Sequence, residues 1–216
     1  MADTGDGMAA PSGRERTLSS TVWIGAPVVL FFAALAVRVV SWNSVFLAAR
    51  VMPFGNDAFY HLRRIRYSVE HFPTVLDFDP LINYPHGAQP IWSPTFDWLM
   101  AAWLILAGAA GDPQRLERLA MWAPPVVGAA TVVLLYFVGR RFFSRGVGLL
   151  AAALLLVLPA HFYYSKLGFV DHHVLVAGVT TWLLAATMDW LREPDAAASG
   201  DGGVPLRRSA LLGLAM

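Results

Sequence analysis

Three long apolar runs constrain the fold of this 216-residue chain more than any other feature. They cover residues 119–139, 147–163 and 174–191, and short polar segments separate them. A helix needs about 20 apolar residues to cross a bilayer core, where unpaired backbone amides are costly. Only 14% of the residues are charged, against about a quarter in a soluble domain. The sequence therefore predicts an all-α, polytopic protein embedded in a lipid bilayer.

An earlier apolar run, residues 21–42, is interpreted as the first span. Arg38 stands near its far end, where its side chain is expected either to extend to the membrane interface or to pair with a buried acid. The preceding residues 1–20 are rich in Gly, Ser and Asp and predict a disordered cytoplasmic tail. A cleaved signal peptide is the alternative, with Leu47-Ala48-Ala49 as the cut site. The tail and the length of the run favour an anchor.

The last residues bear on the extent of the chain, and the composition excludes some partners and sites. Residues 209–216 are apolar but too few to cross a bilayer, so they predict the start of another span. We therefore interpret the chain as an amino-terminal fragment of a longer protein. A formal net charge of +1 argues against a nucleic-acid partner, and the absence of Cys excludes disulfides and Cys-based zinc sites.

Residues 98–110 are the ambiguous part of the topology, because about 13 residues are short for a span. Cytoplasmic loops of membrane proteins carry an excess of Arg and Lys. The basic residues near the spans are Arg14, Arg16, Arg140, Arg141, Arg145, Arg192, Arg207 and Arg208. All of them can be cytoplasmic only if residues 98–110 do not cross. The loops 43–118 and 164–173 are then predicted to lie on the non-cytoplasmic face.

The first loop is predicted to contain an interfacial amphipathic helix that begins at Asn56, a favourable N-cap residue. Asp57 lies in its first turn, where the helix dipole stabilises a carboxylate, and His61 and Arg64 follow near the same face. A divalent metal on Asp57 and a phosphate on Arg63 and Arg64 would satisfy both kinds of charge. The alternatives are an ordinary helix start and a solvated or headgroup-facing stripe of arginines.

The second loop contains Asp171-His172-His173 at the junction of two apolar runs. Ionisable groups at the edge of a membrane are costly and by default mark an ion or substrate site. Asp171 and His173 could together hold a divalent cation, since carboxylate oxygen and imidazole nitrogen are common donors. The alternative is that both histidines cap a helix and face water. Lys166, a few residues earlier, either reaches a lipid phosphate or extends to the interface.

Several motifs occur in a fixed order along the two loops. The first loop contains Asn56-Asp57-Ala-Phe-Tyr60-His61-Leu-Arg63-Arg64-Ile, then Tyr84-Pro85-His-Gly87 and Trp92-Ser-Pro94; the second contains Gly168-Phe-Val-Asp171-His172-His173-Val. Over residues 21–208 this order resembles the catalytic subunits of bacterial and archaeal oligosaccharyltransferases. The resemblance implies a membrane fold of the GT-C glycosyltransferase type in the cell (inner) membrane.

The resemblance also implies roles for single residues. Asp57 matches the first-loop aspartate that touches the metal and the acceptor amide. Asp171 matches the first acid of the Asp-x-Asp or Asp-x-His metal motif, and His173 takes the place of its second member. His172 occupies the variable position and receives no ligand role. A later-loop Glu and a Trp-Trp-Asp motif that the family also carries are not found in this sequence.

The implied reaction is a metal-dependent transfer of an oligosaccharide from a polyprenyl phosphate or pyrophosphate carrier to the Asn side chain of an acceptor polypeptide. Arg63, Arg64 and Lys166 would steady the phosphates. Either Mn²⁺ or Mg²⁺ suits the carboxylates, and the His ligand favours Mn²⁺ slightly.

Two other functions are compatible with these residues. The first is a related polyprenyl-dependent glycosyltransferase that modifies a hydroxyl or a lipid. The second is a membrane protein without enzymatic activity, such as a metal permease or an assembly subunit. A permease would place its ligands on helices near the bilayer midplane, whereas the acids here lie in predicted external loops.

Overall fold

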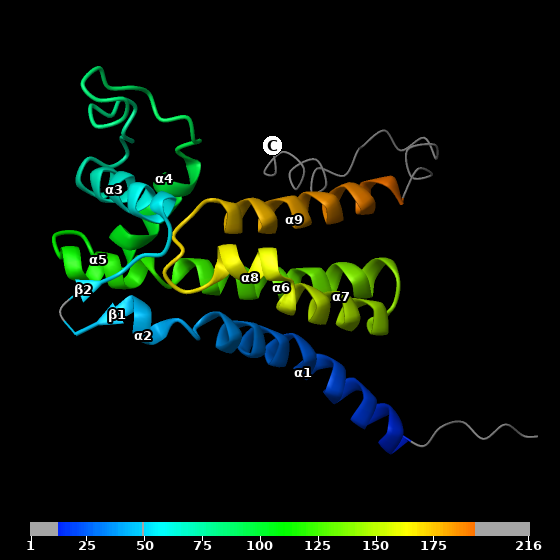
Figure 1. Ribbon diagram of the computed structural model, residues 1–216. Helices are drawn as coiled ribbons and strands as arrows, with labels where there is room; N and C mark the ends of the chain where they lie inside the picture. The colour runs from blue at the N-terminus through cyan, green and yellow to red at the C-terminus, as the bar shows by residue number, and fades with distance from the viewer. Residues whose placement is uncertain (1–12, 49, 193–216) are drawn as a thin grey trace, which may run out of the picture.

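The computed structural model describes residues 13–48 and 50–192, with side chains from residue 25 onward. Long helices form a bundle, and shorter helices with a β-hairpin form a cap at one end of it (Figure 1). The bundle contains α1 (Gly13–Arg38), α6 (Ala123–Phe142), α7 (Arg145–Val157), α8 (Pro159–Ser165) and α9 (His173–Leu191). The cap contains α2 (Trp42–Val45), β1 (Phe46–Leu47), β2 (Arg50–Val51), α3 (Asn56–Glu70), α4 (Thr95–Leu106) and α5 (Pro113–Ala120). The predicted helical class is confirmed, and the two short strands are a minor addition.

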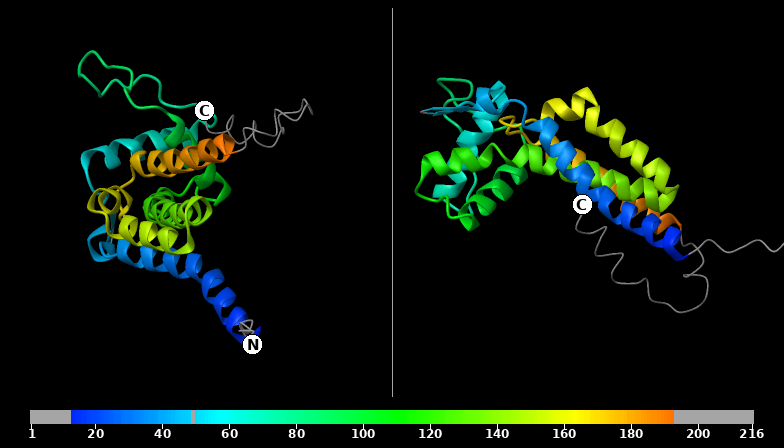
Figure 2. Two further views of the ribbon diagram at one scale, coloured as in Figure 1. Left: turned by 90° about the vertical axis from the view of Figure 1, so that its right-hand side faces the viewer. Right: turned by 90° about the horizontal axis from the view of Figure 1, so that it is seen from below.

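Helix α6 is the centre of the bundle, because it packs against α1, α7, α8 and α9 (Figure 2). Its contact with α7 is close, since a Cβ added to Gly139 would lie 2.6 Å from the Cα of Gly148. Small residues at such positions let helix backbones approach each other. The buried core between α1, α6 and α7 consists of Leu30, Ala34, Ala129, Val132, Tyr136 and Ala152.

The long helices overlap the predicted spans. The helical stretch Pro113–Phe142, which comprises α5 and α6, and helix α9 are long and apolar enough to cross a membrane. Helices α7 and α8 together form a third candidate, with a bend of 63° between them. Helix α1 begins at Gly13, inside the predicted disordered tail. Residues 1–12 and the predicted span start at 209–216 lie outside the described residues. The sidedness of the loops stays a prediction.

The ambiguous apolar segment forms α4, which has 12 residues. At 1.5 Å per residue this helix is about 18 Å long, well short of the ~30 Å hydrocarbon core. Helix α4 packs against α3 and α5 within the cap. Whether residues 98–110 cross the membrane stays a prediction.

Helix α3 differs from its prediction at its start, and its buried face includes polar side chains. Gly55, not Asn56, is the N-cap, with a φ of 83° in the left-handed region that favours glycine. A Cβ at Gly55 would also lie 3.1 Å from the ring of Phe169. The buried side chains are Ala58, His61, Leu62, Arg64, Ile65 and Ser68. His61 and Arg64 therefore belong to the packed face, because they find partners on α4 and, for His61, on the second loop.

Arg38 contradicts the expectation that it extends to the membrane interface, because its side chain is fully buried at the end of α1. Its Nε donates to Ser165 Oγ at 2.7 Å, one terminal nitrogen donates to Ala34 O at 2.9 Å, and the other lies 2.7 Å from His161 Nδ1. Three neutral acceptors inside the bundle thus replace the interface as its environment. We call Arg38, His161 and Ser165 the bundle cluster.

Candidate metal centre

Asp171, the acid of the second loop, has no exposed surface. Its Oδ1 accepts from the backbone N–H of His173 at 3.1 Å and lies 2.7 Å from His173 Nδ1 and 2.9 Å from His172 Nδ1. Its other oxygen, Oδ2, is buried without a hydrogen-bond partner. A buried carboxylate oxygen without a partner is costly unless a ligand or cation satisfies it.

The segment before Asp171 is fixed by backbone hydrogen bonds to three separate parts of the fold. Leu167 N–H donates to Arg38 O at 2.9 Å, Gly168 N–H donates to Met121 O at 3.4 Å, and Phe54 N–H donates to Gly168 O at 2.9 Å. Gly168 has a φ of 88°, and a Cβ there would lie 2.7 Å from Val45 Cγ2. Glycine is therefore required where this segment crosses the cap, and the position of Asp171 follows from that crossing.

His61 on α3 points its ring toward Asp171. Its Nδ1 lies 2.7 Å from Asp97 Oδ1, and its Nε2 lies 3.1 Å from His172 Nδ1 and 3.9 Å from Asp171 Oδ1. A carboxylate that accepts from Nδ1–H fixes the ring and leaves the Nε2 lone pair free, the usual outer support of a metal-binding histidine. Both His61 and Asp97 are buried.

Donor atoms of His61, Asp171 and His172 all lie within 4.8 Å of one another. We call these three residues the candidate metal centre. Two imidazole nitrogens and a carboxylate oxygen form a mixed donor set that suits first-row divalent cations. Together with the unpartnered oxygen of Asp171, this arrangement fits a bound divalent cation.

The environment of His172 favours its neutral form. Burial lowers the pKa of its imidazole below the ordinary value, and the nearby His173 and His61 lower it further, while the carboxylate of Asp171 opposes them. A neutral imidazole keeps a lone pair for a metal ion.

The structure brings only part of the predicted ligand set together. His173 contacts Asp171 but is about half exposed, and its ring stacks on Tyr164 at 4.6 Å. Asp57 is exposed on the first turn of α3, and its carboxylate is not among the grouped donors of the described residues. His61 lies one helical turn after Asp57, so the sequence placed both near one helix face but gave no sign of the contacts of His61 with Asp97 and His172. Asp97, in the first turn of α4, had no signal in the sequence.

The three predicted phosphate-binding residues all have partners inside the protein. Arg63 pairs with Asp79 at 2.9 Å, and Arg64 is buried against Asp97 at 3.1 Å. Lys166 Nζ lies 4.6 Å from the ring centre of Phe54 and 4.5 Å from that of Tyr163. Such distances indicate cation–π contacts, so Lys166 links the second loop to the segment that leads into α3.

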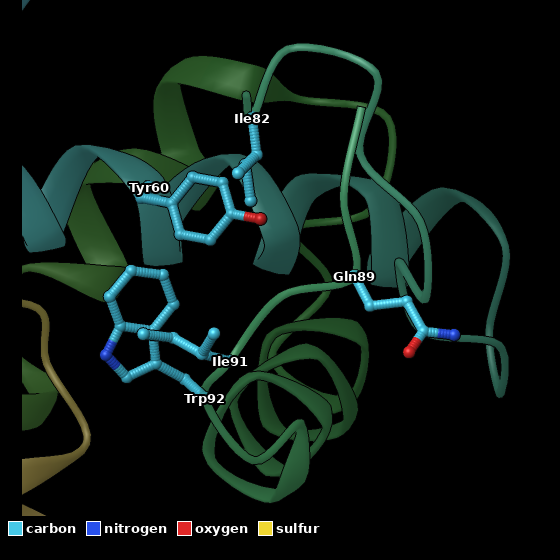
Figure 3. Close-up of a pocket in the computed structure, with 5 residues that line it drawn as sticks. All are labelled: Tyr60, Ile82, Gln89, Ile91 and Trp92. Carbon is cyan, nitrogen blue, oxygen red and sulfur yellow. The ribbon is translucent and has the colours of Figure 1, made fainter. Parts of the chain in front are cut away.

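A pocket of about 170 Å³ lies between α3 and the segment that precedes α4 (Figure 3). The residues that line it are Tyr60, Ile82, Gln89, Ile91 and Trp92. The ring centre of Trp92 lies 5.3 Å from that of Tyr60 and 6.3 Å from that of His61. Trp92 therefore lines the pocket and also lies beside His61 of the candidate metal centre.

Comparison with known proteins places these features in a family. The family described as oligosaccharyl transferase STT3, N-terminal, matches residues 27–201. The dolichyl-monophosphooligosaccharide–protein glycotransferase AglB of Haloferax volcanii is 32% identical over 158 residues, which cover 71% of this chain and 15% of the relative. Dolichyl-phosphooligosaccharide-protein glycotransferase 3 of Archaeoglobus fulgidus is 32% identical over 168 residues, 73% of this chain and 19% of that relative. The chain thus spans less than a fifth of the length of either relative.

Solved structures agree with this result and support the predicted GT-C type of fold. The oligosaccharyltransferase AglB of Archaeoglobus fulgidus, in complex with an inhibitory peptide and a dolichol-phosphate, matches with a TM-score of 0.74 and 25% identity over 91% of this chain and 23% of its own. An oligosaccharyltransferase of the same organism, in complex with Zn and sulfate, matches with a TM-score of 0.72 and 26% identity over 88% of this chain and 23% of its own. In sequence and in fold, the chain belongs to the STT3 family of oligosaccharyl transferases and corresponds to the family's amino-terminal part.

Proposed function

We propose that this chain forms the amino-terminal part of a membrane enzyme that transfers an oligosaccharide from a polyprenyl-linked phosphate or pyrophosphate to the side-chain amide of an acceptor Asn. The observation that carries the proposal is the buried Asp171, which has an unpartnered oxygen and three imidazoles around it. The membership of the chain in the STT3 family supports glycosyl transfer as the class of reaction. Among similar proteins, an archaeal AglB binds both a dolichol-phosphate and an inhibitory peptide.

Asp171 would hold the divalent cation together with His61 and His172, and Asp57 and His173 are the further ligands that the family resemblance implies. When bound, the cation supplies positive charge that stabilises the departing phosphate. Imidazole donors favour Mn²⁺ over Mg²⁺, and a similar oligosaccharyltransferase from Archaeoglobus fulgidus has been determined with Zn.

Asp57 would act on the acceptor. An amide nitrogen is a poor nucleophile, because its lone pair is delocalised into the carbonyl. A carboxylate that accepts from the amide N–H orients the nitrogen toward the sugar and weakens that delocalisation. A C–N bond forms and the glycosidic C–O bond breaks, so that the phosphate leaves on the lipid carrier and the amide gives up one proton to the carboxylate that accepts from its N–H. The exposed position of Asp57 at the start of α3 leaves it accessible to a peptide.

The basic residues divide into two groups in this proposal. Arg63 remains a candidate for the carrier phosphate, because about two fifths of its side chain is exposed beside Asp79. Arg64 is buried against Asp97, so we assign it to the support of His61. Lys166 is held by aromatic rings, and we assign it a positioning role.

The location of the site suits a lipid-linked substrate. The cap lies at one end of the helical bundle (Figure 1). A polyprenyl tail can therefore stay in the bilayer beside the bundle while its head group reaches the cap. We place the cap on the non-cytoplasmic face of the membrane, because Arg140, Arg141, Arg145 and Arg192 lie at the opposite ends of α6, α7 and α9.

The test is transfer of a lipid-linked oligosaccharide to an Asn-x-Thr peptide by the full-length protein, with Mn²⁺ or with a chelator. Asp57→Asn and Asp171→Asn should each abolish metal-dependent glycopeptide formation. Asp77→Asn is the matched control, because it changes an exposed carboxylate of the same loop and should leave transfer unchanged. Activity that survives both site substitutions would exclude the proposed centre. Transfer to a hydroxyl acceptor in place of Asn would assign the chain to a related glycosyltransferase.

A further inference from the structure

We propose that the pocket formed by Tyr60, Ile82, Gln89, Ile91 and Trp92 binds one sugar ring of the glycan on the lipid carrier. The inference rests on the proposed function and adds a subsite to it. Figure 3 shows the rings of Tyr60 and Trp92 close together on one side of the pocket and Gln89 on the other. The position of the pocket, the chemistry of its lining and its size support this assignment.

The pocket lies next to both groups that would act at the glycosidic bond. Tyr60 follows Asp57 by three residues on α3, so both lie near the same helix face. Trp92 closes the pocket and its ring approaches that of His61, a member of the candidate metal centre, with centroids 6.3 Å apart. A sugar whose bond to phosphate lies at the metal centre must place its ring within a few ångströms of it. This pocket is the adjoining hollow.

The lining matches a carbohydrate ring in its chemistry. One face of such a ring presents C–H groups that carry slight positive charge, and the faces of Tyr and Trp carry negative charge from their π electrons. Tyr60 and Trp92 supply two such faces, with centroids 5.3 Å apart. Ile82 and Ile91 complete the apolar wall, and the Gln89 amide offers a donor and an acceptor to hydroxyl groups.

Size and charge argue against other parts of the substrate. The pocket has about 170 Å³, below the roughly 300–1,000 Å³ of sites for drug-sized ligands, so it suits one ring and not a whole oligosaccharide. All five lining residues are uncharged, which does not suit a phosphate. The walls come from α3 and the segment before α4, away from the long apolar helices, which does not suit the polyprenyl tail.

The test uses the full-length protein with two probes: a polyprenyl phosphate that carries a single hexose, and the same polyprenyl phosphate without a sugar. Binding of each is measured at equilibrium, separately from transfer. The variants are Ile91→Ala, Gln89→Ala and Trp92→Leu. Leu81→Ala is the matched control, because Leu81 is an exposed apolar residue of the same loop that does not line the pocket. Ile91 is 87% exposed, so its truncation leaves the packed core intact.

Ile91→Ala and Trp92→Leu should weaken binding of the sugar-bearing probe by about tenfold, as expected when a sugar loses part of a fitted apolar wall. Binding of the bare carrier and the KM for the acceptor peptide should not change. Equal weakening of both probes would assign the pocket to the lipid tail, and a raised peptide KM would assign it to the acceptor. Either result, or unchanged binding in all three variants, overturns the inference.

The two proposals fail in different ways. If the wild-type protein binds the sugar-bearing probe in preference to the bare carrier but transfers nothing to Asn, the proposed reaction is wrong and the subsite stands. If transfer to Asn occurs and the pocket variants bind both probes like the wild type, the subsite is wrong and the reaction stands.

Discussion

The protein contains two buried polar clusters with opposite character. The bundle cluster places the Arg38 guanidinium among neutral acceptors, and the described residues that bond to it include no carboxylate. The candidate metal centre places a carboxylate, Asp171, among imidazoles and leaves one of its oxygens without a partner. The first cluster has an excess of positive charge and the second an excess of acceptors.

Packing sharpens this contrast. A Cβ added to Gly128 would lie 2.4 Å from Ser165 Cβ and 2.9 Å from Arg38 Nε, so the bundle cluster has no room for another group. At the candidate metal centre, His172 and His173 are partly exposed and the pocket adjoins His61. Burial of polar groups alone therefore does not indicate a ligand site. An unpartnered acceptor together with open space does.

Arg38→Met is expected to have the largest effect, because it should lower the stability of the fold without changing the affinity for metal. Arg38→Met should lower the stability of the detergent-solubilised protein by about 3 kcal/mol, because each buried polar group that loses its partner costs roughly 1–3 kcal/mol. Affinity for Mn²⁺ should not change, since the hydrogen bond from Leu167 uses the Arg38 backbone carbonyl. Thermal unfolding and Mn²⁺ titration measure the two quantities. A strong loss of Mn²⁺ affinity in the folded variant would show that the clusters are coupled.

Asp171→Asn should have the opposite pattern: a loss of Mn²⁺ affinity with little change in stability. We expect Mn²⁺ affinity to fall by at least about 100-fold, because loss of a direct ligand should exceed the effect of removing an outer partner. The unfolding temperature without metal should change little, since the unpartnered carboxylate oxygen itself is costly to bury. Electron paramagnetic resonance of bound Mn²⁺ is the readout, with Asp77→Asn as control. An Mn²⁺ affinity equal to that of the wild type in Asp171→Asn would show that Asp171 is not a metal ligand.

Asp97→Asn tests the support of His61. Loss of the charge that holds the imidazole should weaken Mn²⁺ binding by about tenfold. The unfolding temperature should also fall, because Arg64 loses its buried counterion. The titration must therefore be made well below that temperature. A lower unfolding temperature with unchanged Mn²⁺ affinity would make Asp97 a purely structural residue.

Lys166→Met should have the smallest effect. Loss of its cation–π contacts with Phe54 and Tyr163 should cost about 1 kcal/mol of stability. The KM for the lipid-linked substrate should stay near the wild-type value, because Lys166 positions the loop in this interpretation. A large rise in that KM would instead support the phosphate-binding role predicted from the sequence.

Much of the fold could be predicted from the sequence, because lipid leaves few choices to a long apolar segment. The runs at 119–139, 147–163 and 174–191 correspond to helices, and the short run at 98–110 forms a helix within the cap. Arg38 was misjudged, because a single basic residue near a helix end gives no sign of the acceptors that helix α8 brings to it.

The site was predictable only where its residues adjoin in sequence. Asp171 and His173 form one short motif, so their contact was expected. His61, Asp97 and His172 come from three separate elements, and their grouping depends on how α3 and α4 pack against the second loop. The fixed position of Lys166 depends likewise on rings from distant segments. Periodicity carries no information on such contacts between elements.

The backbone hydrogen bonds of Leu167 and Gly168 have a consequence for local opening of the protein. Exchange of an amide hydrogen requires its hydrogen bond to break, and these two amides are bonded to the end of α1 and to the junction of α5 and α6. Opening of the loop must break both hydrogen bonds, so both amides should exchange more slowly than those of the exposed segment around Ile91. Asp171 is then a fixed point of the fold, because the residues before it are held to the end of α1 and to the junction of α5 and α6.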